Sequence, residues 1–64
     1  MSTLEKTYYE QEDLLNKMYD RRRTFSRIIA SGKRISARLQ AEYDNMIHTL
    51  VVLTNAIRDL ENNA

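Results

Sequence analysis

The fold of this chain is decided at its midpoint, where residues 28–36 read IIASGKRIS. Gly32 is the only glycine among the 64 residues, and the chain contains no proline. Because glycine readily adopts the left-handed backbone conformation that often ends a helix, Gly32 predicts a turn between two helical halves. We therefore predict an all-α fold, a single helical-hairpin domain over residues 1–64. Its first helix spans about 3–31, the turn falls at residue 32, and the second helix spans about 33–62.

Apolar residues recur along the first half at spacings of three and four, which is the period of an amphipathic helix. Ser2 and Glu5 fit the pattern of a capping box, so the helix is expected to start there. The sequence predicts a buried stripe that includes two polar members, Gln11 and Arg22. The full stripe is Leu4, Tyr8, Gln11, Leu15, Met18, Arg22, Phe25 and Ile29, widened by Leu14, Tyr19 and Ile28.

The second half carries the stronger stripe, which no polar residue interrupts. It consists of Leu39, Tyr43, Met46, Leu50, Leu53, Ile57 and Leu60. Further apolar residues lie outside it, namely Ile47, Val51, Val52 and Ala56, so this helix is more apolar than one partner helix requires. Burying an additional Val or Ile contributes roughly 1.5–3 kcal/mol. We therefore expect the hairpins to self-associate into a helical bundle, a homo-oligomer of at least two chains, with an interface made by Met46, Leu50, Val51, Leu53, Ile57 and Leu60.

One continuous helix is an alternative to the hairpin. The spacing of the two stripes continues without interruption through Ile29, Gly32, Ser36 and Leu39. A glycine inside a helix costs only about 1 kcal/mol, so Gly32 does not forbid a long coiled coil. Gly32 and Ser36 are poor residues for a buried seam, however, and they fall together where a turn is expected. This coincidence favours the hairpin.

The composition limits how so small a chain is stabilised. Small domains with thin cores are usually supported by disulfides, a metal or oligomerisation. The chain has no cysteine, and His48 is its only histidine, so we expect no metal and no cofactor. No apolar run approaches the roughly 20 residues of a membrane span, and the first residues lack the apolar core of a signal peptide. We therefore expect a cytoplasmic protein that does not bind a membrane.

Charge is strongly segregated along the chain. Residues 21–38 contain seven Lys and Arg and no acidic residue, a charge of +7. Residues 1–20 have five carboxylates against two lysines, and residues 39–64 have four against Arg58, so each flank carries −3. Guanidinium groups can bind phosphate oxygens in pairs, and clustered cations attract polyanions. The candidate phosphate-binding residues are Arg23, Arg27, Lys33, Arg34 and Arg38.

These features predict a non-catalytic protein. No nucleophile, base and orienting group can be assembled from the sequence with any specificity, and one glycine cannot form a glycine-rich phosphate loop, so an enzyme is not expected. The leading hypothesis is an oligomeric helical protein that binds nucleic acid or a nucleotide through its basic turn. One alternative is a small adaptor or inhibitor that binds another protein through a helical face. Another is that the basic turn offsets acidic residues of a partner hairpin, namely Glu5, Glu10, Asp59 and Glu61.

Overall fold

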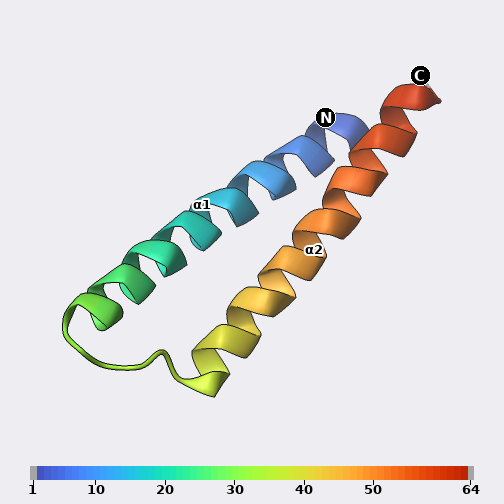
Figure 1. The fold of residues 1–64 in the computed structure, drawn as a ribbon. Coiled ribbons are helices and arrows are strands. Elements are labelled where there is room, and N and C mark those ends of the chain that lie inside the picture. The colour runs from blue at the N-terminus through green and yellow to red at the C-terminus, as the bar shows by residue number, and fades with distance from the viewer. Residues whose placement is uncertain (1, 64) are drawn as a thin grey trace.

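The computed structural model describes residues 2–63 and consists of two antiparallel helices (Figure 1). Helix α1 spans Thr3–Ala30 and helix α2 spans Ala37–Asn62, with a loop over residues 31–36. The hairpin predicted from the sequence is confirmed, and the alternative of one continuous helix is wrong. The molecule is elongated, with principal dimensions of 49 × 17 × 13 Å. The loop lies at one end and both described chain ends lie at the other (Figure 1).

Local hydrogen bonds fix where α1 begins and ends. The Ser2 hydroxyl accepts from the Glu5 backbone N–H at 3.2 Å, as the capping pattern predicts. At the other end, Gly32 has a φ of +80°, in the left-handed region. Its N–H donates to the carbonyl of Ile29 at 3.0 Å, and the N–H of Lys33 donates to the carbonyl of Ile28 at 3.2 Å. These two bonds form a Schellman motif, which satisfies the last carbonyls of α1.

Helix α2 begins at Ala37, four residues later than the predicted start at residue 33. Ser36 explains the difference, because its extended backbone and its hydroxyl make it the N-cap of α2. The hydroxyl accepts from the backbone N–H of Leu39 at 3.2 Å. Lys33, Arg34 and Ile35 therefore belong to the loop. Serine is among the preferred N-cap residues, so Ser36 was a visible signal for this boundary.

The inward face of α1 differs in part from the predicted stripe. Leu4, Gln11, Met18 and Phe25 are shielded, as predicted. Four other members of the predicted stripe are exposed, namely Tyr8, Leu15, Arg22 and Ile29. In each case the residue one position earlier faces α2 instead, namely Thr7, Leu14, Arg21 and Ile28. The prediction was therefore wrong for these four and for Tyr19, five of the eleven residues of the full stripe, and it was right for Leu14 and Ile28.

Polar contacts account for the register that α1 adopts. Thr7 can be buried because its hydroxyl donates to the carbonyl of Thr3 at 2.8 Å, which removes the penalty of an unsatisfied group. Arg21 faces α2 because its guanidinium pairs with Glu42 at 3.5 Å. Tyr8, from the edge of the contact, donates its hydroxyl to Glu61.

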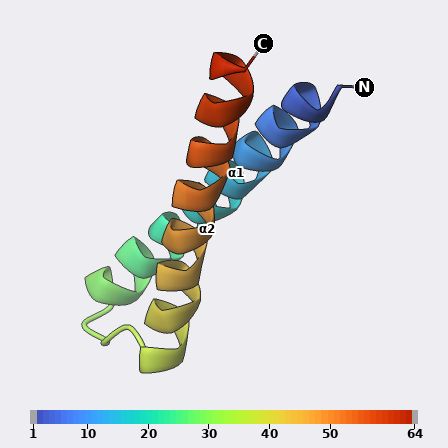
Figure 2. The ribbon, with the colours of Figure 1, turned by 90° about the vertical axis from the view of Figure 1, so that its right-hand side faces the viewer.

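All seven residues of the stripe predicted for α2 are shielded, which confirms that prediction. Tyr43 packs edge-on against Phe25 with ring centroids 5.5 Å apart, and the Gln11 amide donates to the Thr54 hydroxyl at 3.1 Å. The helices cross along their length when viewed from the side (Figure 2). Burial is shallow, since Met18 and Ile57 still expose 8 and 6% of their surface. Neither α1 nor α2 combines the length and apolar character needed to cross a membrane.

Candidate functional site

The five candidate phosphate-binding residues all lie at the loop end of the hairpin, and all are exposed. Arg23 and Arg27 come from the last two turns of α1, and Arg38 comes from the first turn of α2. Lys33 and Arg34 lie in the connecting loop. The antiparallel arrangement therefore brings the cations of both helices and the loop to one end of the molecule (Figure 1).

Glu42 is the carboxylate that offsets part of this charge. It forms ion pairs with Arg38, 3.4 Å from Nε, and with Arg21, 3.5 Å from Nη2. Across residues 2–63, the only other ion pair joins Lys17 to Asp13 at 3.2 Å. The remaining four candidates have no carboxylate within ion-pair distance in this part of the chain, namely Arg23, Arg27, Lys33 and Arg34. Most of the positive charge at the loop end is thus available to a ligand.

The start of α2 presents backbone N–H groups at this end. Unpaired N–H groups in the first turn of a helix carry partial positive charge and favour anions. Ser36 uses its hydroxyl for the N–H of Leu39, and the N–H of Gln40 donates to the carbonyl of Ser36. No acidic side chain lies in this first turn. The C-terminus of α1 lies at the same end and carries partial negative charge, so the two helix dipoles largely offset each other and the side-chain cations determine the potential there.

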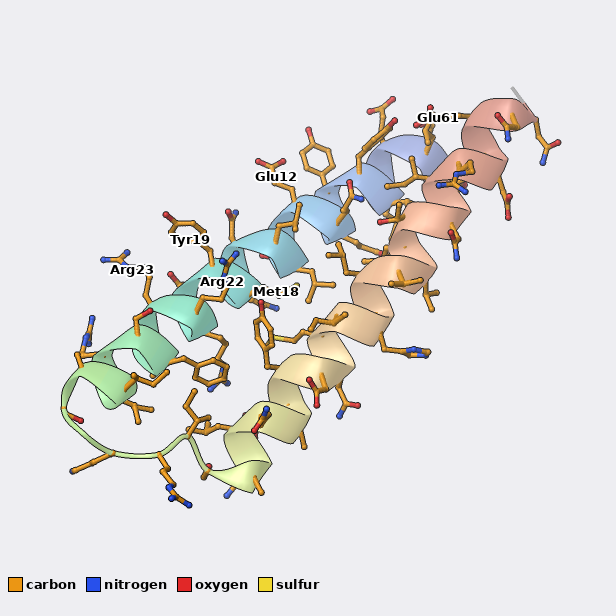
Figure 3. The ribbon with its side chains drawn as sticks, viewed as in Figure 1. Glu12, Met18, Tyr19, Arg22, Arg23 and Glu61 are labelled. Atoms are coloured by element: carbon orange, nitrogen blue, oxygen red, sulfur yellow. The ribbon has the colours of Figure 1, made fainter. Side chains whose placement is uncertain are left out.

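Two shallow depressions border the basic end along α1. One, of about 210 Å³, is lined by Tyr19, Arg22, Arg23 and Ser26. The other, of about 240 Å³, extends from Tyr19 and Arg22 toward Met18 and Tyr43. Figure 3 shows Tyr19 and Arg23 projecting from α1 on the side away from α2, whereas the Arg22 side chain lies over the α1 ribbon. Pockets for small ligands are usually larger, roughly 300–1,000 Å³, so the basic end resembles an open surface more than a nucleotide pocket.

The site prediction did not include Arg22, because this residue was assigned to the buried stripe. The structure places it on the surface beside Tyr19, where it lines both depressions. The sequence alone did not show which of the three consecutive arginines, residues 21–23, faces the other helix, since any one of them fits the helical period almost equally well. Glu42 was the available signal, because an acidic residue close to the seam of α2 selects one of the three as its partner.

The predicted oligomer interface is largely occupied within the hairpin. Val51 is exposed, whereas the other five residues lie on the shielded stripe of α2 that faces α1, namely Met46, Leu50, Leu53, Ile57 and Leu60. Between Ser2 and Asn63, no group of three or more His, Asp and Glu side chains is arranged to hold a metal ion. Comparison of the chain with protein-family models, curated proteins and solved structures finds no match.

Proposed function

We propose that this protein is a non-catalytic binder of phosphate-bearing polymers, that is, a nucleic-acid-binding helical hairpin. The observation that supports this proposal most directly is the cluster at the loop end. There, Arg23, Arg27, Lys33 and Arg34 are exposed and have no acidic partner among residues 2–63. Nothing of comparable positive charge lies elsewhere on the molecule, because both flanking segments are acidic.

A polymer fits the shape of this surface better than a single nucleotide does. The cations come from two helices and a loop, and the two depressions beside them have volumes of only about 210 and 240 Å³. A phosphate backbone can follow such an open surface and contact several cations in turn. Tyr19, which is 64% exposed beside Arg22 and Arg23, offers an aromatic ring on which an unpaired base can stack.

Salt dependence of binding to a fluorescent single-stranded oligonucleotide tests this proposal. Four phosphate contacts predict a slope of about −3 for log K against log salt. Replacing Arg27 and Arg34 together by Ala should make this slope less steep by about 1–2 and weaken binding at every salt concentration. Fluorescence anisotropy at increasing NaCl concentrations measures both quantities.

Lys17→Ala is the matched control, because it removes a cation that is already paired with Asp13 and lies away from the loop end. This variant should bind like the unmodified chain. Binding that does not weaken with salt, or an equal loss in the Lys17 variant, would refute a site at the loop end.

A second candidate function is that of an adaptor that binds another protein through a helical face. The observation in its favour is the number of large apolar side chains that the hairpin leaves exposed, including Tyr9 at 59% and Val52 at 54%. Such binding would depend mainly on apolar burial, so its affinity would change little with salt. The same salt series therefore separates the two functions once a partner is in hand.

A further inference from the structure

One broad face of the hairpin is apolar. Its residues each follow an inward-facing residue by one position, as Tyr19 follows Met18 and Val51 follows Leu50. Each residue of a right-handed helix is turned by about 100° from the one before, so in an antiparallel pair these following residues lie on the same broad side. Each of them exposes between 42 and 64% of its surface. We call this side the apolar face, and its members are Tyr8, Leu15, Tyr19, Ile47 and Val51.

The opposite broad face is polar. Its residues precede an inward-facing residue by one position, as Lys17 precedes Met18 and Arg27 precedes Ile28. The same side holds Thr24 and Thr49, with Val52 as its one large apolar member. The two broad faces of one thin hairpin thus differ sharply, and only the apolar face exposes a set of large side chains that water solvates poorly.

Six charged residues lie on the apolar face by the same rule of position, and all are exposed; they are Glu5, Glu12, Arg22, Asp44, Arg58 and Glu61. Glu5 and Glu61 lie near the termini, and the other four frame the middle of the face. Figure 3 shows Glu12 and Arg22 separated along α1, on either side of Tyr19. Each helix therefore presents two acids and one base to this face, and one acid and one base from each helix make up the four framing charges.

The positions of these charges are related by symmetry. Glu12 and Arg22 are equally distant from residue 17, and Asp44 and Arg58 are equally distant from residue 51. Phe25 and Tyr43 contact each other across the hairpin, and their residue numbers add up to 68. In two antiparallel helices, residues at the same height share this sum. Positions 17 and 51 also add up to 68, so they lie at the same height of the hairpin. In each helix the acid and the base of the framing four therefore lie at equal distances on opposite sides of this common height. This is the requirement for a surface that is complementary to itself under a two-fold rotation.

From this pattern we infer that a second copy of the chain covers the apolar face, turned end for end, so that two hairpins form an antiparallel dimer. Arg22 then meets Glu12 of the second copy, and Arg58 meets its Asp44. Val51 lies against Val51 of the second copy near the two-fold axis, and Tyr19 lies against its Leu15. The shielded seam of each hairpin and the new contact together form a four-helix bundle.

Overall charge selects the antiparallel orientation. The four framing charges alternate around the face, so they would also match if both loops lay at the same end. That arrangement would place two segments of +7 side by side, whereas the antiparallel one places each beside two segments of −3.

This dimer does not depend on the proposed function and leaves its phosphate contacts open, but it covers Tyr19 and Arg22, so a base can stack on Tyr19 only in the single hairpin. Arg27 and Arg38 precede inward residues and therefore lie on the polar side, and Lys33 and Arg34 lie in the loop. The apolar face contains none of these cations, so the contact leaves them accessible.

Cysteine cross-linking tests the contact and its orientation together, because the natural chain has no cysteine. Val51→Cys places a thiol near the proposed two-fold axis. Val52→Cys, its control, places a thiol of nearly equal exposure, 54 against 52%, on the opposite broad face. With mild oxidation or a short bismaleimide and no nucleic acid present, the first variant should become a covalent dimer and the second should stay largely uncross-linked. Equal cross-linking of the two variants, or none in either, would overturn the proposal.

Charge reversal provides the second test, read by sedimentation equilibrium. Arg22→Glu should raise the dimer dissociation constant by about tenfold or more, because two opposite-charge contacts become like-charge contacts. Adding Glu12→Arg to this variant should restore the affinity, and Lys17→Glu on the polar face should leave it unchanged. Circular dichroism confirms that each variant keeps its helices. A natural chain that sediments as a monomer, or a double variant that is not rescued, would refute the dimer; loss of oligonucleotide binding alone would refute only the proposed function.

Discussion

Tyr8 and Glu61 join the two helices at the end of the hairpin that carries the termini. The Tyr8 phenol donates a hydrogen bond to the Glu61 carboxylate, and this bond raises the pKa of Tyr8 above its ordinary value of 10.0. Desolvation and the negative charge of Glu61 act in the same direction. The cause is simple, since ionised Tyr8 loses its donor proton and is repelled by the carboxylate.

The shifted pKa of Tyr8 predicts how stability responds to alkaline pH. Folded Tyr8 holds its proton at a pH where the unfolded chain has begun to lose it, so the free energy of unfolding should decrease as pH rises above about 10. Below that pH the contribution is fully present. Tyr8→Phe should remove this part of the pH dependence, as measured by urea unfolding between about pH 8 and about pH 11.

Tyr9→Phe is the control for this experiment, because Tyr9 lies one position away and is 59% exposed. It should keep the alkaline dependence of the natural chain. A Tyr8→Phe variant that loses stability above pH 10 as steeply as the Tyr9 variant would show that the hydrogen bond to Glu61 contributes nothing measurable.

At the scale of the helices, the sequence determined α2 better than α1. All seven residues predicted to face inward on α2 do so, because the stripe alternates with clearly polar positions such as Asp44 and Asn45. In α1 two registers were nearly equivalent: one offered Tyr8 and Leu15, the other Thr7 and Leu14. Apolar periodicity alone does not separate such a pair. The choice depends on Glu42 and Thr54 across the contact, which are visible only once the helices are aligned.

The same reasoning explains what was predictable about the site. Clustering of Arg23, Arg27 and Arg38 at one end follows from the position of the turn, and the turn follows from Gly32. The partners of individual cations do not follow from it, since the pairing of Arg38 with Glu42 depends on where α2 starts. Neither was the apolar face predictable, because Tyr8 and Leu15 had been placed in the buried stripe.

The N-cap of α2 carries a prediction at this scale. Ser36→Ala removes the hydroxyl that accepts from the N–H of Leu39, and it should lower the free energy of unfolding by about 1 kcal/mol. Ser36→Asn, which keeps an accepting oxygen, should lower it much less. Thermal unfolding followed by circular dichroism measures both. Equal stability of the two variants would mean that α2 does not depend on this cap.

At the scale of the whole molecule, the hairpin has little interior. Met18, Ile57 and Thr7 are the only buried residues among those that the structure describes, and none of the three is completely enclosed. A single hairpin therefore gains a modest amount from apolar burial, which is typical of very small domains. A second copy packed on the apolar face would bury a further layer of apolar side chains, and the opposite charges of the two ends would determine how the two copies align.

The short loop also has a consequence for how the chain folds. Contacts near the loop close small segments, 18 residues for Phe25 and Tyr43, whereas Gln11 and Thr54 are 43 residues apart and Tyr8 and Glu61 are 53 apart. Closing a longer segment loses more chain entropy, about 0.6 kcal/mol for each doubling of length. We therefore expect the helices to pair first at the loop and then progressively toward the termini.

This order places the first step of folding where like charges are most concentrated. Salt screens that repulsion, so NaCl should raise the refolding rate of the dilute chain while changing the unfolding rate much less. Stopped-flow refolding at several salt concentrations measures the two rates, and an effect of salt confined to unfolding would contradict the expected order. The charge that we propose for ligand binding would then also slow the hairpin's own nucleation.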